Sequence, residues 1–177
     1  MSAWFTRNRL IGLGFAAFIA VIDQVVKYYV TVTLGINRPG DKMELLPFFD
    51  LTYTENRGIS LGMLEATSME MRWLLVGLTA LIALVVLIWM MREKHLGDIL
   101  GLAMILGGAI GNIRDRYLLG YVVDFADLHI GTFRPFLIFN IADAAITIGV
   151  VIILARSLFV REKDENNSDG DAVPAEN

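Results

Sequence analysis

The stretch that decides the fold is WLLVGLTALIALVVLIWMM, residues 73–91, which contains no charged residue. A helix needs about 20 consecutive apolar residues to cross the hydrocarbon core of a bilayer. An uncharged run of this length is therefore predicted to be a transmembrane helix. The composition of the whole chain agrees, because 55% of its 177 residues are hydrophobic and only 19% are charged.

Three further apolar segments accompany this one, at about residues 10–30, 98–119 and 136–159. The first of them is not typical of a cleavable signal peptide, because its apolar run continues past Asp23 and Lys27 and no small-residue cleavage site follows. Asp98 is a candidate N-cap for the second of them. The sequence thus predicts an all-α membrane protein with four transmembrane helices in a single membrane-embedded domain, residues 1–160.

Basic residues near the helix ends predict the orientation of the chain, because Lys and Arg are enriched in cytoplasmic loops. With four spans, one face of the membrane receives six of them: Arg7, Arg9, Arg92, Lys94, Arg161 and Lys163. The other face receives five, so the bias is incomplete: Arg38, Lys42, Arg57, Arg72 and Arg134. We expect both termini to be cytoplasmic.

Two segments then lie on the outer side, at about residues 34–70 and 120–135. Apolar and polar residues alternate from Phe49 to Thr54 after a turn signal at 38–41, which predicts a half-exposed strand. Residues 121–127 are a second strand candidate. We therefore expect a small extracytoplasmic β-element and loop at the membrane surface.

Two remaining segments have weaker patterns. Residues 64–72 could form a short surface helix. Residues 161–177 are polar and acidic without an apolar period, so we expect a disordered cytoplasmic tail.

Ionisable residues at membrane depth are the main functional signal in the chain. An Asp near the helix centre costs about 2.5 to 3.5 kcal/mol on insertion scales, so such residues usually face the bundle interior or a wet cavity. Residues three and four apart share one helix face, and this spacing groups several polar and small residues: Asp23 with Lys27, Gly108 with Asn112 and Arg116, and Asn140 with Asp143. We expect these faces to meet near the outer surface, with Asp143 about two helical turns, or roughly 10 Å, inside the membrane.

Asp124 follows the third helix on the outer side, and the short loop before the fourth helix can bring it to Asp143. A buried carboxyl pair cannot easily ionise twice, because like charges repel in a low-dielectric site. One carboxyl then stays protonated while the other is charged, and together they can activate a water and protonate a scissile amide. The pattern indicates an aspartyl peptidase.

Other functional classes lack their signals. The chain has no cysteine, which excludes a disulfide framework and a thiol nucleophile. We find no His-Glu-x-x-His zinc motif and no Gly-x-Ser-x-Gly elbow. A net charge of −4 without a basic cluster argues against nucleic-acid binding. Two alternatives stay open: a proton-coupled transporter or channel subunit that uses Asp23 and Asp143 as a relay, and a non-enzymatic assembly partner.

Five short motifs resemble those of the bacterial lipoprotein signal peptidases (signal peptidase II). They occur in the family's order between about residues 20 and 150: Asp23-Gln24-x-x-Lys27, Asn56-Arg57-Gly58, GGAIGNIRDR at 107–116, VVDF at 122–125, and FNIAD at 139–143. Any one of them is a weak signal, whereas five in order on four spans form a specific one. Arg114 departs from the pattern, because the family usually has an apolar residue there.

The resemblance implies a peptidase that removes the signal peptide from diacylglyceryl-modified prolipoproteins, just before the lipidated cysteine, near the outer leaflet of the bacterial cytoplasmic (inner) membrane. By match, Asp124 and Asp143 are the catalytic pair. The substrate-binding or supporting residues are then Asp23, Lys27, Asn56, Gly58, Gly108, Asn112, Arg116 and Asn140. No metal or organic cofactor is implied. The expected partners are lipid-modified prolipoproteins and the bilayer, and we expect a monomer.

Some of these residues also have a structural interpretation. Asp23 and Lys27 could form only an i,i+4 ion pair that steadies the first helix. Arg116 could extend its charge to the membrane interface or orient Asn112 and a carboxylate. The segment from Asn56 to Gly58 could be an ordinary turn.

Overall fold

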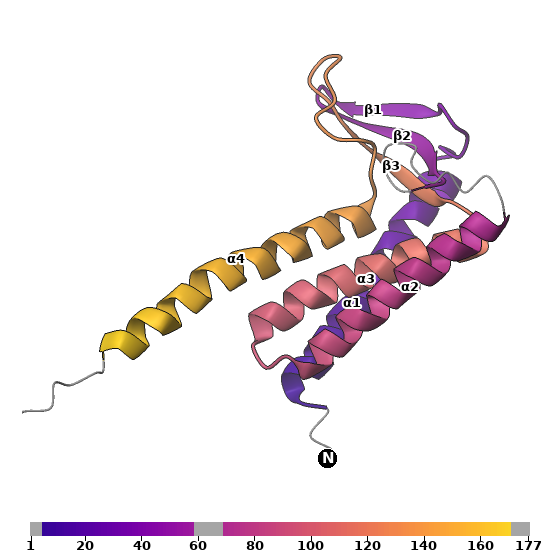
Figure 1. Cartoon of the computed structure of the whole chain (residues 1–177). Coiled ribbons are helices and arrows are strands. Elements are labelled where there is room, and N and C mark those ends of the chain that lie inside the picture. The colour runs from indigo at the N-terminus through magenta and orange to yellow at the C-terminus, as the bar shows by residue number, and fades with distance from the viewer. Residues whose placement is uncertain (1–4, 59–68, 171–177) are drawn as a thin grey trace, which may run out of the picture.

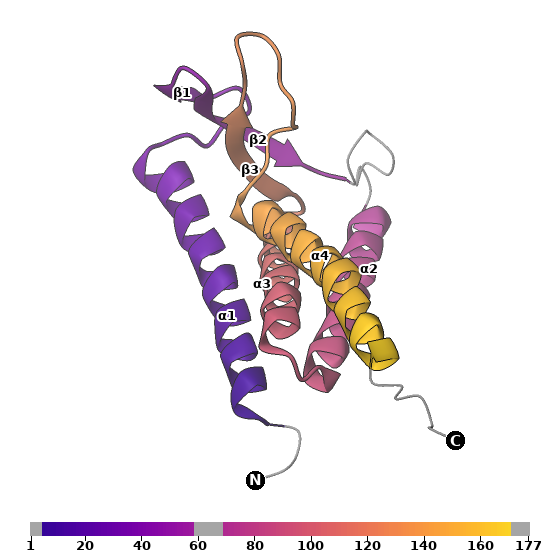
Figure 2. The same cartoon turned by 90° about the vertical axis from the view of Figure 1, so that its left-hand side faces the viewer.

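The computed structural model describes residues 5–58 and 69–170, without the side chains of residues 159–170. Four long helices form a bundle, and a small sheet lies on one end of it (Figures 1 and 2). Helix α1 begins, and helix α4 ends, at the opposite end of the bundle (Figure 2). The C-terminal half of α4 diverges from the other helices (Figure 1).

The helices are α1 (Arg7–Tyr28), which continues into the π-helical turn η1 (Tyr29–Thr33), α2 (Met69–Arg92), α3 (Leu96–Leu118) and α4 (Ile141–Gly170). Within the described residues, four helices are long and apolar enough to cross a membrane, with α1 counted through η1 and α4 counted as far as Leu158. The prediction of four membrane helices with a small sheet is confirmed, and the side of the membrane on which the sheet lies stays a prediction.

The start of α4 differs from the sequence prediction, which placed it near residue 136. Phe139 instead pairs with Ala126 as an isolated antiparallel bridge, with its N–H donating to the Ala126 carbonyl at 3.1 Å and its carbonyl accepting at 2.8 Å. Because the backbone N–H and C=O of Phe139 are hydrogen-bonded to the edge of the sheet, the helix begins only at Ile141. Asp143 therefore lies in the first turn of α4, and the expectation that it lies about two turns from the start of the helix is wrong.

The start of α3 also differs from expectation. The helix begins at Leu96, so Asp98 lies in its first turn and is not the N-cap. The Asp98 carboxylate accepts hydrogen bonds from the Arg156 guanidinium instead, at 2.7 and 3.2 Å. This pair ties α3 to α4 at the end of the bundle away from the sheet.

Two expectations concern parts of the chain that are described incompletely. Helix α4 continues to Gly170, past the expected end at residue 159 and into the segment predicted to be disordered. Residues 171–177 lie outside the described part, and so does most of the surface helix expected at 64–72. Disorder of the tail stays a prediction.

Helix α3 is central and packs against the three other helices. Its buried residues Ile99, Leu102 and Leu106 form a core with Ala16 of α1 and Met90 of α2. Small residues allow the closest approaches. A Cβ on Gly107 would lie 2.5 Å from the Ala16 carbonyl, and a Cβ on Gly108 would lie 2.4 Å from the Ala142 carbonyl. Close packing through small residues, which is common between membrane helices, is thus present on two faces of α3.

The sheet contains β1 (Lys42–Leu46), β2 (Phe49–Asn56) and β3 (Val122–Leu128) in the antiparallel order β1-β2-β3. The predicted strands correspond to β2 and β3, whereas β1 had no clear signal. Leu51 and Tyr53 of β2 pack with Val123 and Phe125 of β3 in a second core. All residues from Val122 to Asp127 are buried, so Asp124 on β3 is held inside the protein.

Candidate active site

Asn140 and Asp143 cap α4 reciprocally. The Asp143 N–H donates to Asn140 Oδ1 at 2.8 Å, and the Asn140 N–H donates to Asp143 Oδ2 at 3.3 Å. This is the geometry of a capping box, in which two residues three apart satisfy N–H groups at the start of a helix. The partial positive charge of a helix N-terminus also favours a carboxylate there. The sequence from Asn140 to Asp143 therefore places the Asp143 carboxyl at the sheet end of α4.

Asp124 reaches the same place from β3. Its Oδ1 accepts a hydrogen bond from Asn140 Nδ2 at 2.6 Å, and its Oδ2 accepts one from Asn56 Nδ2 at 3.0 Å. Asn140 thus contacts both aspartates, Asp124 through its amide nitrogen and Asp143 through its backbone and its side-chain oxygen. The two residues predicted to form a pair meet around one asparagine.

Asn112 of α3 supports the pair from the membrane side. Its Nδ2 donates to Asp143 Oδ1 at 2.8 Å, and its Oδ1 accepts from Asn140 Nδ2 at 3.2 Å. Each carboxyl is therefore held by neutral amide groups. In the part of the chain that the structure describes, neither Asp124 nor Asp143 forms an ion pair.

Burial has a direct consequence for Asp124, which is 2% exposed. Removal from water disfavours the charged form of a carboxyl, and a neighbouring negative charge adds to this effect. Burial first, and then the charge of Asp143, raise the pKa of Asp124 to about 7, although the Asn56 and Asn140 hydrogen bonds oppose the rise. Asp124 can therefore keep a proton up to neutral pH.

A second acidic cluster lies next to the pair, and Lys27 is at its centre. Lys27 Nζ lies 2.8 Å from Asp23 Oδ2 and 2.7 Å from Asp115 Oδ2, and both carboxylates are buried. Asp23 Oδ1 also accepts the Ala142 N–H at 3.0 Å, and Asp115 Oδ2 accepts the Val123 N–H at 3.3 Å. This cluster joins α1 and α3 to the first residues of β3 and α4, from which Asp124 and Asp143 project.

Two residues of this network were missing from the predicted site. Asp115 supplies the second carboxylate to Lys27, and Gln24 Nε2 lies 3.1 Å from Asp23, 2.9 Å from Asp115 and 3.2 Å from the Gly111 carbonyl. A signal for both was present, because Gln24 is part of the Asp-Gln-x-x-Lys motif and Asp115 lies three residues after Asn112.

The remaining predicted residues lie on the side of β2. Asn56 Oδ1 accepts the Gly58 N–H at 3.3 Å, so the segment is a local turn that also directs the Asn56 amide at Asp124. Arg116 Nη2 approaches the Gly58 carbonyl at 3.5 Å, while its Nε is buried without a hydrogen-bond partner. The guanidinium thus lies beside the pair without forming an ion pair.

The predicted residues therefore fall into three groups. A continuous hydrogen-bond network links the pair to Asp23, Lys27, Asn112 and Asn140. Asn56, Gly58 and Arg116 surround the pair on the sheet side. Gly108 is the exception, because it allows α3 to approach α4 and offers no group to a ligand.

Several known proteins are similar in sequence to this chain. A sequence model of the family described as signal peptidase (SPase) II matches residues 15–159. The lipoprotein signal peptidase of Sphingopyxis alaskensis is 55% identical over 152 residues, which is 86% of this chain and 87% of that protein. The lipoprotein signal peptidase of Rhizorhabdus wittichii is 49% identical over 170 residues, 96% of this chain and 94% of that protein.

Solved structures show the same architecture. A bacterial membrane enzyme superposes on this chain with a TM-score of 0.73 at 28% identity, covering 94% of both chains. A second bacterial membrane enzyme gives a TM-score of 0.71 at 32% identity, covering 84% of this chain and 93% of the other.

Proposed function

The chain belongs to the signal peptidase II family, and from this premise we propose that it cleaves diacylglyceryl-modified prolipoproteins just before the lipidated cysteine by an aspartyl mechanism. Membership makes it a multi-pass membrane peptidase of the lipoprotein signal peptidase type. The bond that is cleaved, the catalytic residues and the outer-leaflet position of the site are parts of the proposal, as are a monomeric state and cytoplasmic termini.

One observation carries the aspartyl mechanism. Two carboxyls, Asp124 and Asp143, meet at Asn140, and amide donors hold both of them, with no ion pair to either among the described residues. A structural pair of acids in a buried site would need a counter-charge, because two adjacent carboxylates repel each other. A pair that shares one proton needs none, and this is the protonation state that acid–base hydrolysis requires.

The position of the shared proton assigns the acid and base roles of Asp124 and Asp143. Asp124 is the protonated member near neutral pH, because burial and Asp143 raise its pKa to about 7. Asp143 is then the base that takes a proton from water, whose oxygen attacks the scissile carbonyl carbon. Asp124 donates its proton to the carbonyl oxygen. Asp143 then passes the proton it took from water to the leaving nitrogen, and a hydroxyl of the tetrahedral gem-diol returns its proton to Asp124 as the C–N bond breaks, so one proton is again left on the pair for the next turnover.

The transporter alternative finds less support. A proton relay would need ionisable groups through the depth of the bundle. Between the Lys27 cluster and the pair of Asp98 and Arg156, the buried core of the described helices is apolar, with Ala16, Leu102 and Leu106. The polar groups gather instead at the sheet end, which favours a single catalytic site there.

The test is cleavage of a lipidated prolipoprotein by purified Asp124→Asn and Asp143→Asn variants in detergent micelles. Each variant should lose at least about 10³-fold in rate, the order seen when one member of a catalytic unit is removed. Asp98→Asn is the matched control, because it changes the same residue type at the far end of the bundle. Near-normal cleavage by either site variant, with folding intact, would reject the aspartyl pair and favour a non-enzymatic role for these residues.

A further inference from the structure

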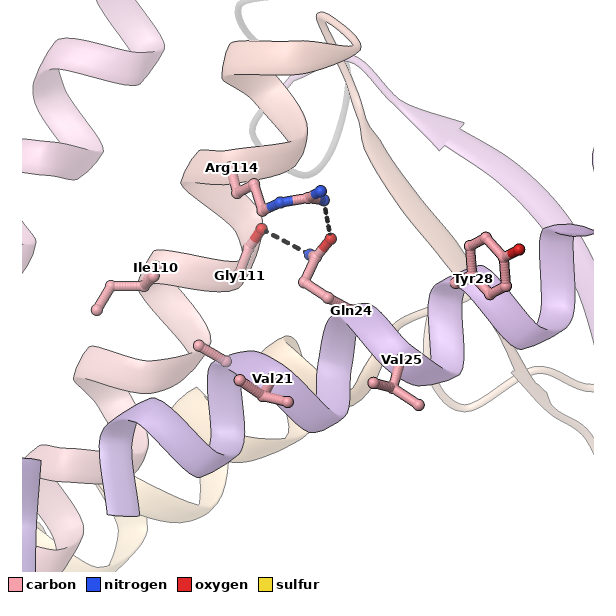
Figure 3. Close-up of a pocket in the computed structure, with 8 residues that line it drawn as sticks. Val21, Gln24, Val25, Tyr28, Ile110, Gly111 and Arg114 are labelled. Carbon is pink, nitrogen blue, oxygen red and sulfur yellow. Dashed lines mark hydrogen bonds between the residues drawn. The ribbon is translucent and has the colours of Figure 1, made fainter. Parts of the chain in front are cut away.

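A groove on the surface of the bundle lies apart from the carboxyl pair, between α1 and α3 (Figure 3). Its volume is about 420 Å³, within the range of ligand pockets. Val21 and Val25 of α1 and Ile110 of α3 form its walls. These side chains are 60%, 55% and 44% exposed, and they lie on membrane-spanning helices, so lipid is the medium that meets them.

The groove is polar at one end only. Helices α1 and α3 run in the same direction, towards the sheet (Figure 2). Val21 and Ile110 therefore lie deeper in the bundle than Tyr28 and Arg114, which are nearer to the sheet end. The groove is thus apolar along its length and ends at the Arg114 cation and the Tyr28 hydroxyl. This matches the polarity of a lipid, because Tyr is favoured at the level of the headgroups.

Arg114 is the cation at this end, and a neutral partner holds it. Its guanidinium donates to Gln24 Oε1 across the groove (Figure 3). The amide nitrogen of Gln24 is in turn directed at Asp23 and Asp115, which Lys27 bridges. Among the described residues, no carboxylate lies within ion-pair distance of Arg114. The hydrogen bond to Gln24 thus holds the guanidinium in place, and its charge has no counter-ion among the described residues.

The position of Arg114 decides which counter-ion can reach it. It lies four residues before the end of α3 at Leu118, or roughly 6 Å along the helix axis, and its long side chain can extend that distance to the interface. An uncompensated Arg at membrane depth is costly. A lipid phosphate is the anion present at that level, and Arg binds it through charge-assisted hydrogen bonds.

We propose that the groove binds a glycerophospholipid with an anionic headgroup. The phosphate lies on Arg114, and one acyl chain lies along Val21, Val25 and Ile110. Gln24 is a positioning residue, because it holds the guanidinium over the groove. This site does not depend on the proposed peptidase activity, since none of these side chains touches Asp124 or Asp143.

The absence of cysteine allows a clean test on the full chain. A cysteine introduced by Val25→Cys is labelled with a small fluorophore, and the protein is placed in phosphatidylcholine nanodiscs that contain brominated lipid as quencher. Brominated phosphatidylglycerol should quench at least threefold more than brominated phosphatidylcholine at equal mole fraction. Arg114→Gln should bring this ratio to about one, whereas Arg114→Lys should retain most of it, because Lys also binds phosphate.

Two controls make the outcome decisive. Leu81→Cys reports on an exposed residue of α2 that does not line the groove, and its ratio should be near one in every background. Val21→Cys is a second reporter in the groove, in case the label at residue 25 blocks the site. Equal quenching by both lipids at both reporters overturns the proposal. So does a preference that survives Arg114→Gln, and equal quenching by both lipids is also the result expected if a lipidated substrate peptide or a second copy of the chain occupies the groove instead.

Discussion

Two buried pairs of aspartates lie side by side at the sheet end of the bundle, and they are compensated in opposite ways. Asp23 and Asp115 flank the Lys27 ammonium at 2.8 and 2.7 Å. Asp124 and Asp143 contact only amide groups. The two pairs share one neighbour, Asn112, whose Oδ1 accepts from Lys27 Nζ at 3.3 Å and whose Nδ2 donates to Asp143 at 2.8 Å.

This difference distinguishes the Lys27 cluster, which has a structural role, from the pair of Asp124 and Asp143, for which we propose a catalytic role. A cation between two buried carboxylates attracts both of them, so the Lys27 cluster serves to hold four elements together. Amide donors orient the other carboxyl pair without an ion pair, and repulsion between two adjacent carboxylates favours a proton on one of them. The same residue type therefore has a structural role in one place and a proposed catalytic role a few ångströms away.

The largest expected effect comes from removing the cation. Lys27→Met leaves Asp23 and Asp115 buried and unpaired, and breaking a buried ion pair by deleting one partner costs about 3 to 5 kcal/mol. We expect most of the folded protein to be lost, measured as a large fall in the unfolding midpoint in detergent. Lys94→Met, at an exposed position in the link between α2 and α3, is the matched control. A Lys27→Met protein as stable as the control would mean that the cluster is not a scaffold.

The second expected effect is a change of folding stability with pH that arises from the raised pKa of Asp124. Its pKa is about 7 in the folded protein, against 3.8 as the ordinary value. Between these values the folded state retains a proton that the unfolded chain releases, so the stability that Asp124 contributes is fully present below about pH 4 and is lost as pH rises towards 7. One pKa unit is about 1.4 kcal/mol, which makes the change on the order of 1 to 4 kcal/mol. Asp124→Asn should lose less stability than the unmodified protein between pH 4 and pH 8 in denaturant titrations. Parallel curves for the two proteins would contradict the raised pKa.

The smallest expected effect separates two tasks of Asn140. Asn140→Ala removes both the helix cap and the hydrogen bond to Asp124, and loss of an N-cap costs about 1 kcal/mol. Asn140→Ser keeps a capping oxygen but is too short to reach Asp124. Only the Ala variant should be less stable in thermal unfolding.

Both Asn140 variants should share one change in the pH dependence of cleavage. The Asn140 amide lowers the pKa of Asp124, so its removal raises that pKa further above the value of about 7. The alkaline limit of cleavage, where the pair loses its last proton, should therefore move to higher pH in both variants. A pH–rate profile with an unchanged alkaline limit would show that Asn140 acts only on the helix.

Much of this arrangement could be predicted from the sequence. The uncharged segment at residues 73–91 predicted a helix in contact with lipid, and α2 does expose most of its large apolar side chains. The period of three and four residues placed Asp23 and Lys27 on the buried face of α1, and they are its buried ionisable residues. The alternation from Phe49 to Thr54 predicted β2. These are local patterns, which short-range geometry imposes on the chain wherever it lies.

Other features depend on contacts between distant residues. Strand β1 exists because β2 offers it an edge, and its own sequence has no clear alternation. The sequence predicts Phe139 to be part of an apolar helix. In the structure Phe139 pairs with Ala126, so α4 begins at Ile141 and Asp143 lies in its first turn. No pattern within residues 136–143 could reveal this, because the deciding partner belongs to β3.

The sequence by itself determined the class of the protein: four apolar helices, two carboxyls able to meet, and five motifs in the order of one family. Only the tertiary structure decided which buried carboxyls form an ion pair with a cation. Lys27 could be paired with Asp23 from their spacing of four, whereas its contact with Asp115 requires α3 to pack on α1 at Gly107. Charge compensation in a buried site depends on distances of a few ångströms between elements far apart in the chain, and spacing along the sequence does not contain those distances.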